Sequence, residues 1–139
     1  MNPLQLTPDD SATIDSLVRA SLGARLRAHA PYSNFQVGAA LLADDGEMFI
    51  GCNIENASFS LTLCAERVAA AAAVTAQKRH WRAIAIASKG GVSPCGACRQ
   101  FLSEFGHELL VVCVDAQSEQ RKIFQLSDLL PHAFDHIPQ

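Results

Sequence analysis

Three cysteines and one glutamate, set in two short segments, constrain this chain more than any other feature of its sequence. Cys64 and Glu66 lie in the first segment, and Cys95 and Cys98 follow Pro94 in the second. The spacing of Cys95 and Cys98 places both sulfur atoms on one face at the start of a helix. Thiolates are preferred zinc ligands, and a site with three protein ligands keeps one position for water. The ligand count therefore favours a catalytic zinc site over a structural site, which a fourth protein ligand normally closes.

Glu66 stands close enough to Cys64 in the sequence to serve the same site as a proton carrier. Zinc lowers the pKa of a water molecule that it binds, and a neighbouring carboxylate can take the released proton. The ordinary structural explanation is a glutamate in the first turn of a helix, where it interacts favourably with the helix dipole. The cysteines in both segments favour the catalytic role.

Length and composition predict one globular domain that spans residues 1–139. A chain of 139 residues can bury a hydrophobic core without a disulfide. Hydrophobic residues make up 49% of it and charged residues 18%, which suits a compact fold with extensive contacts between subunits. The net charge of −3 and the lack of a basic run argue against a nucleic-acid partner.

The N-terminal sequence and the remaining cysteines predict where the protein works. Residues 1–10 carry no basic or apolar leader, and the longest apolar run, residues 68–74, is too short to span a membrane. Cys52 and Cys113 lie in strand-like runs, where we expect small buried thiols rather than a disulfide. We therefore predict a cytoplasmic protein with no membrane partner.

Hydrophobic periodicity and turn residues predict a sheet with helices on both faces. Thr7 is the expected cap of a first helix that continues to about His29, with Pro8 in its first turn. An Asp-Asp-Gly turn at residues 44–46 separates two strand-like runs and predicts a hairpin. Strands are expected at residues 35–43, 48–53, 81–88, 109–115 and 122–126, and two more helices over residues 95–105 and from the Cys64 segment, capped by Ser60 or Thr62. This order predicts a three-layer α/β/α sandwich around a mixed five-stranded sheet.

Six short segments of the sequence form one pattern when they are taken together. They are Pro-Tyr-Ser-Asn-Phe at residues 31–35, Val-Gly-Ala-Ala at 37–40, Gly-Cys-Asn-Ile-Glu-Asn-Ala at 51–57, Cys-Ala-Glu-Arg at 64–67, Pro-Cys-Gly-Ala-Cys-Arg-Gln at 94–100 and Leu-Leu-Pro-His-Ala-Phe at 129–134. In this order they resemble the small cytidine deaminases of the homotetrameric type, whose zinc site has three cysteines. The resemblance extends from about the end of the first predicted helix to near the C-terminus.

This resemblance implies a zinc-dependent enzyme of pyrimidine salvage that deaminates cytidine and deoxycytidine to uridine and deoxyuridine, with release of ammonia. One Zn²⁺ per chain would be bound by Cys64, Cys95 and Cys98. We expect Glu66 to protonate N3 of the pyrimidine and later to pass a proton to the amine that leaves C4. Three thiolates give the zinc centre a net negative charge, and our hypothesis is that Arg67 offsets it by hydrogen-bonding one or two ligand sulfurs.

Further residues are expected to hold the nucleoside. Asn53 and Glu55 share a face if the strand continues through them, and the resemblance places them on the ribose 3′-hydroxyl. It places the Phe35 ring against the pyrimidine and the Ala65 backbone at the amide edge of the base. Phe134 resembles a C-terminal phenylalanine that reaches a base bound in a neighbouring subunit, so a homotetramer with shared sites is implied. Ordinary loop or core roles remain the alternatives for the side chains in this set.

Two other interpretations of the function stay open. A deaminase of an aminopyrimidine nucleoside antibiotic such as blasticidin S would use the same chemistry, although residues 53–56 argue for an ordinary nucleoside. A zinc-stabilised binding protein without catalysis would need a fourth ligand such as Cys52, Cys113 or a histidine, and it leaves Glu66 unexplained. Turnover of cytidine compared with the antibiotic tests the first interpretation, and the number of protein ligands on the metal tests the second.

Overall fold

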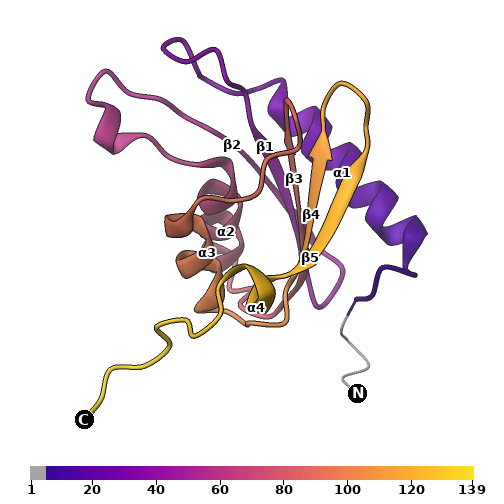
Figure 1. Cartoon of the computed structure of the whole chain (residues 1–139), viewed down its shortest axis with the longest axis vertical. Helices are drawn as coiled ribbons and strands as arrows, with labels where there is room; N and C mark the ends of the chain where they lie inside the picture. The colour runs from indigo at the N-terminus through magenta and orange to yellow at the C-terminus, as the bar shows by residue number, and fades with distance from the viewer. Residues whose placement is uncertain (1–5) are drawn as a thin grey trace.

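Within residues 6–139, which the computed structural model describes, five strands form one central sheet (Figure 1). The strands are β1 (Gly38–Ala43), β2 (Met48–Cys52), β3 (Trp81–Ser88), β4 (Leu110–Asp115) and β5 (Arg121–Gln125). They are arranged in the order β2-β1-β3-β4-β5. β3 and β4 are parallel, whereas the other neighbouring pairs are antiparallel. The sheet is therefore mixed, as predicted.

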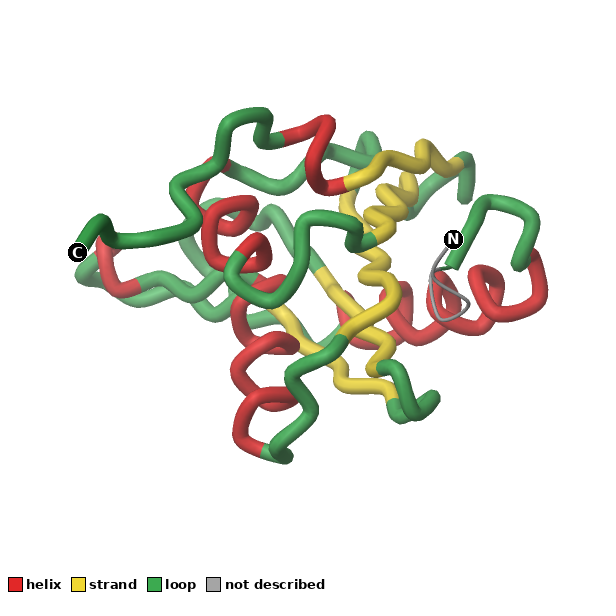
Figure 2. Tube along the Cα trace, turned by 90° about the horizontal axis from the view of Figure 1, so that it is seen from below, coloured by secondary structure: helices red, strands yellow, loops and turns green. Residues whose placement is uncertain are grey.

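Helices cover both faces of this sheet. α1 (Ser11–Arg25) lies against one face, and α2 (Ala65–Thr75) and α3 (Gly96–Ser103) lie against the other (Figure 1). A short 3-10 helix, η1 (Phe59–Leu61), precedes α2, and α4 (Leu126–Leu129) follows β5 directly. From below, α1 again lies on one side of the strands and α2 and α3 on the other (Figure 2). This is the predicted three-layer α/β/α arrangement.

Two hydrophobic clusters, one on each face of the sheet, hold the layers together. Successive residues of a strand point to opposite faces, so β1 directs Ala39 and Leu41 into the cluster under α2 and α3. Ala40 and Leu42 belong to the cluster under α1. All six residues of β1 are buried. The central strands therefore read as continuous hydrophobic runs, as is typical of strands covered on both faces.

The hairpin predicted at residues 44–46 connects β1 and β2. Gly46 adopts a φ of +93°, which a residue with a Cβ atom rarely adopts. At the tip, the Asp45 carboxylate pairs with Lys78 Nζ over 2.6 Å. Since Lys78 follows the end of α2, this ion pair connects the hairpin to the layer that carries Cys64 and the residues after it.

Gly51 in β2 allows α2 to approach the sheet closely. A Cβ atom at this position would lie 2.5 Å from both Ala65 O and Ala69 N. The buried residues Ala69, Ala70 and Ala73 give α2 a small-side-chain face that complements the glycine. The position of the N-terminal end of α2, which carries the cysteine-glutamate segment, therefore depends on this close contact.

The first helix begins later and ends earlier than the sequence predicts. α1 begins after Asp10, and the predicted cap Thr7 lies in a preceding turn, where the Asp10 N–H donates to Thr7 O over 3.0 Å. α1 ends at Arg25 rather than near His29, because His29 forms a β-bridge with Ile54. The predicted boundaries were wrong because backbone groups at both ends found partners outside the helix.

Two other predicted boundaries are also corrected. The N-cap of α2 is Cys64, not Ser60 or Thr62, and Ser60 lies in η1. β1 begins at Gly38 rather than at residue 35, because the Phe35 carbonyl and the Val37 N–H form hydrogen bonds with the side chain of Asn53.

All five cysteines are free thiols, with Cys113 buried and Cys52 half-buried. Across residues 6–139, no helix is long and apolar enough to cross a membrane. Residues 1–5, part of the segment in which we expected no leader, lie outside the described residues.

Candidate active site

Cys64, Cys95 and Cys98 come together at the N-terminal ends of α2 and α3. Cys64 and Cys95 are the N-cap residues of these helices, and Cys98 lies in the first turn of α3. Their three Sγ atoms lie within 4.8 Å of one another. Helix N-termini carry partial positive charge, so both helices stabilise thiolates at this position. The cluster that the sequence predicts is thus present in the fold.

The cluster has the composition and size of a zinc site. Tetrahedral zinc with bonds of about 2.3 Å holds its sulfur ligands about 3.8 Å apart, so a small movement of these side chains would allow all three to bind. Within residues 6–139, no histidine and neither Cys52 nor Cys113 joins the cluster. Three ligands leave one position for a reacting molecule, as a catalytic site requires.

The thiols of the cluster differ in how readily they ionise. The pKa of Cys64 is lowered to about 5, first because the Cys98 thiol donates a hydrogen bond to it and then because of Arg67. The same hydrogen bond raises the pKa of Cys98. Cys64 is therefore the thiolate of the pair, and it lies next to the guanidinium group that the sequence marked as its partner.

Arg67 donates a hydrogen bond from Nη2 to Cys64 Sγ over 3.5 Å. The pKa of Arg67 is raised by this bond, so the side chain remains cationic at any pH of interest. The contact is the one on which its hypothesised role depends. Guanidinium groups suit such a position because they are weakly hydrated and keep their charge when half-buried.

Glu66 lies in the first turn of α2 with only 5% of its surface exposed. Burial raises the pKa of its carboxyl group, and the neighbouring Cys64 thiolate acts in the same direction. Hydrogen bonding by the Glu66 backbone N–H and, to a smaller degree, by the Cys98 thiol lowers the pKa and opposes this effect. A buried carboxyl group with a raised pKa beside three metal-binding thiols is suited to accept and return protons.

Asn53 and Glu55 are both buried at the end of β2, and both hold the loop that precedes β1. Asn53 Oδ1 accepts from the Val37 N–H over 2.9 Å, and Asn53 Nδ2 donates to Phe35 O over 2.8 Å. Glu55 Oε1 accepts from the N–H groups of Tyr32 and Ser33 over 2.9 and 3.2 Å, and Glu55 Oε2 accepts from Ser33 Oγ over 2.5 Å. These bonds, the one from Ser33 Oγ first, lower the pKa of Glu55. The two side chains therefore have a structural task that sequence reasoning did not assign.

The three other residues predicted to contact the nucleoside differ in burial: Ala65 is buried, whereas Phe35 and Phe134 are exposed. Ala65, the first residue of α2, is buried beside Glu66. Phe35 is 37% exposed in the loop held by Asn53, and Phe134 is 67% exposed in the C-terminal segment. The Phe134 ring is thus uncovered within its own chain.

Sequence reasoning missed two residues of α3: Arg99, which holds the segment before Cys95, and Gln100, which holds the C-terminal segment. The Arg99 guanidinium donates to Pro94 O over 2.7 Å, to Leu129 O over 2.8 Å and to Ser93 Oγ over 3.0 Å. Gln100 Nε2 donates to Phe134 O over 2.8 Å. The Cys-Arg-Gln sequence within residues 94–100 was the available signal, although the partners are too distant in sequence to infer.

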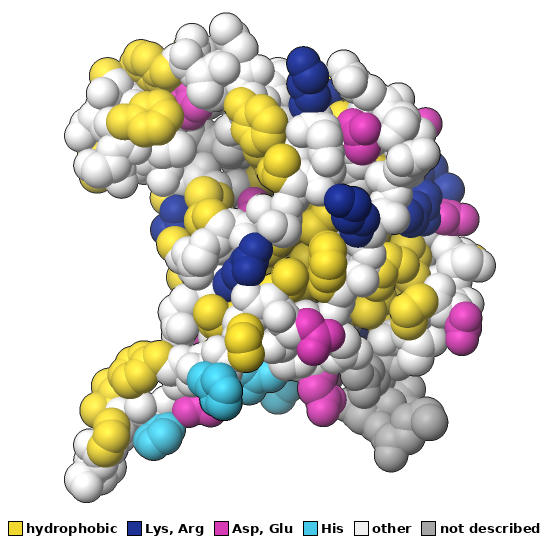
Figure 3. Space-filling model, in the orientation of Figure 1, with side chains coloured by type: hydrophobic (Ala, Val, Ile, Leu, Met, Phe, Trp, Pro, Cys, Tyr) yellow, Lys and Arg dark blue, Asp and Glu magenta, His cyan; other side chains and the backbone are white. Residues whose placement is uncertain are grey.

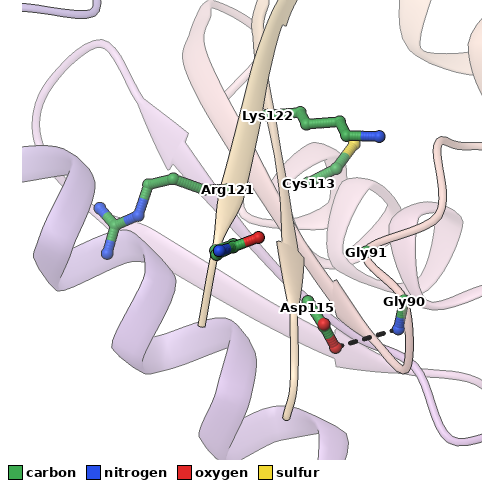
Figure 4. A pocket seen from close by; sticks show the side chains of 7 residues that line it. Gly90, Gly91, Cys113, Asp115, Arg121 and Lys122 are labelled. Atoms are coloured by element: carbon green, nitrogen blue, oxygen red, sulfur yellow. Dashed lines mark hydrogen bonds between the residues drawn. The ribbon is translucent and has the colours of Figure 1, made fainter. Parts of the chain in front are cut away.

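A cavity of about 480 Å³ lies away from the thiol cluster, beside β4 and β5 (Figure 4). Its lining includes Cys113 and Lys122, which are paired across the two strands. Burial raises the pKa of the Cys113 thiol to about 11, so this cysteine is not a reactive thiolate at neutral pH. Asp115 accepts from the Gly90 N–H over 3.0 Å, and Arg121 pairs with Asp15 on α1. Asp115, the acidic residue that lines the cavity, is thus already hydrogen-bonded within the chain.

Comparisons with known proteins agree with this fold and site. The family described as the cytidine and deoxycytidylate deaminase zinc-binding region matches residues 11–114. The cytidine deaminase of Sporosarcina psychrophila is 44% identical over 123 residues, which cover 87% of this chain and 90% of that protein. The cytidine deaminase of Halalkalibacterium halodurans is 46% identical over 121 residues, which cover 85% and 91%.

Solved structures give the same result. The cytidine deaminase of Burkholderia pseudomallei superposes with a TM-score of 0.82 at 46% identity, over 86% of this chain and 98% of that one. The cytidine deaminase of Mycobacterium tuberculosis superposes with a TM-score of 0.77 at 40% identity, over 88% and 98%. The three-layer fold and the three-cysteine cluster define the class of zinc-binding deaminases. This chain belongs to the cytidine and deoxycytidylate deaminase family.

Proposed function

We propose that residues 1–139 act as one catalytic domain that hydrolyses cytidine and deoxycytidine to uridine and deoxyuridine, with release of ammonia. The observation that carries the proposal is the buried Glu66 carboxyl group beside three cysteines that can hold one Zn²⁺. The relatives of this chain are cytidine deaminases, which supports the nucleoside as the substrate rather than an antibiotic.

Proton transfer is the task of Glu66 in this mechanism. Cys64, Cys95 and Cys98 would hold Zn²⁺, which would lower the pKa of a water molecule and so supply hydroxide as the nucleophile for C4 of the pyrimidine. Glu66 takes the proton from that water and donates it to N3 of the ring. It then takes the proton of the hydroxyl group newly formed on C4 and donates it to the amine, so that the C4–N bond breaks, ammonia leaves and C4 becomes a carbonyl. Burial favours this exchange because a raised carboxyl pKa lies closer to neutral pH, where a group can both accept and donate.

Asn53 and Glu55 are proposed to bind one hydroxyl group of the sugar. A carboxylate offers about four acceptor positions, and the loop occupies three of those of Glu55. One position on Oε2 remains, and the Asn53 amide keeps one N–H after its bond to Phe35 O. A single hydroxyl can donate to the first and accept from the second. The ribose 3′-hydroxyl, which cytidine and deoxycytidine share, meets this requirement.

The base is proposed to lie between Phe35 and the start of α2. The exposed Phe35 ring offers an apolar face for the pyrimidine, and the backbone of Ala65 offers hydrogen-bonding groups for the amide edge of the base. Arg67 is proposed to withdraw charge from the ligand sulfur of Cys64.

We further propose a homotetramer in which Phe134 reaches a base in a neighbouring subunit. Phe59, Leu61, Phe134 and Ile137 are all exposed, and the side of the molecule toward which α2 and α3 lie is hollowed between the upper lobe and the projecting C-terminal segment (Figure 3). Such uncovered aromatic and aliphatic side chains favour contact with another protein surface. A second copy of this chain is the partner that family membership supports.

We propose the cytoplasm as the place of action and pyrimidine salvage as the role. The three cluster cysteines must stay reduced to bind zinc, which a reducing compartment ensures. A soluble nucleoside is the substrate, and no nucleic acid or membrane takes part.

The first test is the loss of the ultraviolet absorbance band of cytidine on addition of purified protein, with zinc per chain measured on the same sample. Loss of the band with about one zinc per chain supports the proposal. Blasticidin S is tested in parallel. Bound zinc without turnover of cytidine would overturn the proposal, and turnover of the antibiotic alone would assign that substrate instead.

A further inference from the structure

The loop before β1 is held by side chains that are proposed to bind the sugar. Both backbone polar groups of Phe35 in this loop are hydrogen-bonded to side chains. Phe35 O accepts from Asn53 Nδ2 over 2.8 Å, and the Phe35 N–H donates to Ser33 Oγ over 3.0 Å. Between them, Asn34 has a φ of +57°, a conformation in which asparagine is better tolerated than most other residues. The position of the Phe35 ring therefore depends on these two polar partners.

Ser33 is the residue that joins this loop to Glu55. Its hydroxyl group has one hydrogen, which it donates to Glu55 Oε2 over 2.5 Å, and its lone pairs accept from the Phe35 N–H. The backbone N–H of Ser33 also donates to Glu55, at Oε1 over 3.2 Å. One small side chain thus orients the carboxylate and the backbone of the aromatic residue at once.

We propose that Ser33 is a positioning residue that couples the sugar-binding carboxylate of Glu55 to the base-binding ring of Phe35. The inference rests on the proposed function, because it takes the sugar and base contacts from there. Ser33 Oγ holds Glu55 Oε2, the same oxygen that keeps one acceptor position for the substrate hydroxyl. The Ser33 hydroxyl group therefore orients both the Glu55 carboxylate, which binds the substrate hydroxyl, and the backbone of Phe35.

This coupling predicts a substrate-dependent loss when the Ser33 hydroxyl is removed. Cytidine uses both the Glu55 carboxylate and the Phe35 ring, so the Ser33→Ala substitution affects both of its contacts. 3′-Deoxycytidine has no hydroxyl at this position and depends on the ring contact alone. Because these contacts exist before and during the reaction, the loss should fall on KM rather than on kcat.

The test measures kcat and KM for both nucleosides with wild-type protein, Ser33→Ala and Ser33→Thr. Loss of one hydrogen bond to a charged group corresponds to a change of about tenfold, so we expect KM for cytidine to rise about tenfold in Ser33→Ala. For 3′-deoxycytidine the rise should be several-fold smaller. Ser33→Thr keeps the hydroxyl group and should restore most of the difference between the two substrates. Ser16→Ala, which removes a hydroxyl that bonds to Ala12 O within α1, is the matched control.

An equal loss for both nucleosides, or a loss confined to kcat, would show that Ser33 only maintains the fold and would overturn the coupling. Zinc content and circular dichroism identify a variant that fails to fold. In that case Ser33→Cys, which keeps the size of the side chain but donates weakly, replaces Ser33→Ala in the same comparison. Inactivity of the wild-type protein toward cytidine would overturn the proposed function itself, and this result is distinct from any ratio between variants.

Discussion

Arg67 donates a hydrogen bond from Nη2 to Cys64 Sγ over 3.5 Å, within the first turn of α2. Cys64 is the N-cap residue of α2 and a predicted zinc ligand, and Arg67 is a cation one turn later in the same helix. A cluster of three thiolates around Zn²⁺ carries a net negative charge, which makes a bound water molecule harder to ionise. The hydrogen bond reduces the electron density on one of the three sulfurs.

Arg67→Ala should therefore slow deamination at neutral pH while zinc remains bound. Loss of a hydrogen bond to a charged sulfur corresponds to about 1.5–3 kcal/mol, or a decrease in kcat of roughly tenfold to a hundredfold. The alkaline shift of the pH–rate profile and the zinc content, measured on the same preparation, check the expectation. Arg19→Ala on the far layer, α1, is the control. An unchanged profile with unchanged zinc content would remove Arg67 from the mechanism.

Glu66→Gln should abolish most activity and make the zinc-stripped protein more stable at neutral pH. General acid–base catalysis contributes about 10²- to 10⁴-fold, so kcat should fall by this amount with zinc retained. Burial raises the pKa of Glu66, so the folded state disfavours its charged form, and this cost appears as pH rises from about 4.5 through the raised pKa. The melting temperature of Glu66→Gln should exceed that of the wild type at pH 7 and match it at pH 4. Wild-type rates in the variant would contradict the assignment.

Gly51→Ala should displace α2 and lower both stability and zinc binding. Its Cβ would lie 2.5 Å from Ala65 O and Ala69 N, and backbone atoms of a packed helix cannot move without cost, typically about 1–3 kcal/mol or more. Gly23→Ala in α1 is the matched control, because nothing lies within 4 Å of its Cβ position. It should stabilise the helix by about 0.5–1 kcal/mol. Thermal melts and zinc titrations compare the two, and equal behaviour would mean that the close contact does not position the site.

Glu55→Gln should be less stable than the wild type at neutral pH, and the difference should disappear in acid. Hydrogen bonds from Ser33 and the loop N–H groups lower the pKa of Glu55 below its ordinary value of 4.5. Ionised Glu55 therefore stabilises the folded state fully above about pH 4.5, and this contribution is lost as pH falls through the lowered pKa. Melting temperatures of both proteins from pH 7 to pH 3 provide the measurement. A difference that grows toward acid pH would contradict the sign.

The sequence predicted the sheet and its helices well because local patterns carry that information. Buried strands such as β3, at Trp81–Ser88, matched their predicted limits, since hydrophobic runs end where polar residues begin. The ends of α1 and the start of β1 were wrong. At the C-terminal end of α1 and at the start of β1, the deciding partners are distant in sequence: Ile54 for His29, and Asn53 for Phe35 and Val37.

By itself, the sequence determined the chemistry of the site: three thiols, one carboxyl group and one guanidinium group at spacings that suit two helix starts. Only the tertiary structure decided how these groups are tuned. Burial of Glu66 and the use of Asn53 and Glu55 to hold the loop of Phe35 depend on contacts between segments far apart in the chain. The bond from Arg67 to Cys64 is local, but its side-chain geometry follows from the helix that the fold places there. Desolvation and hydrogen-bond geometry are properties of the packed chain, because they depend on which atoms exclude water and which donors face which acceptors.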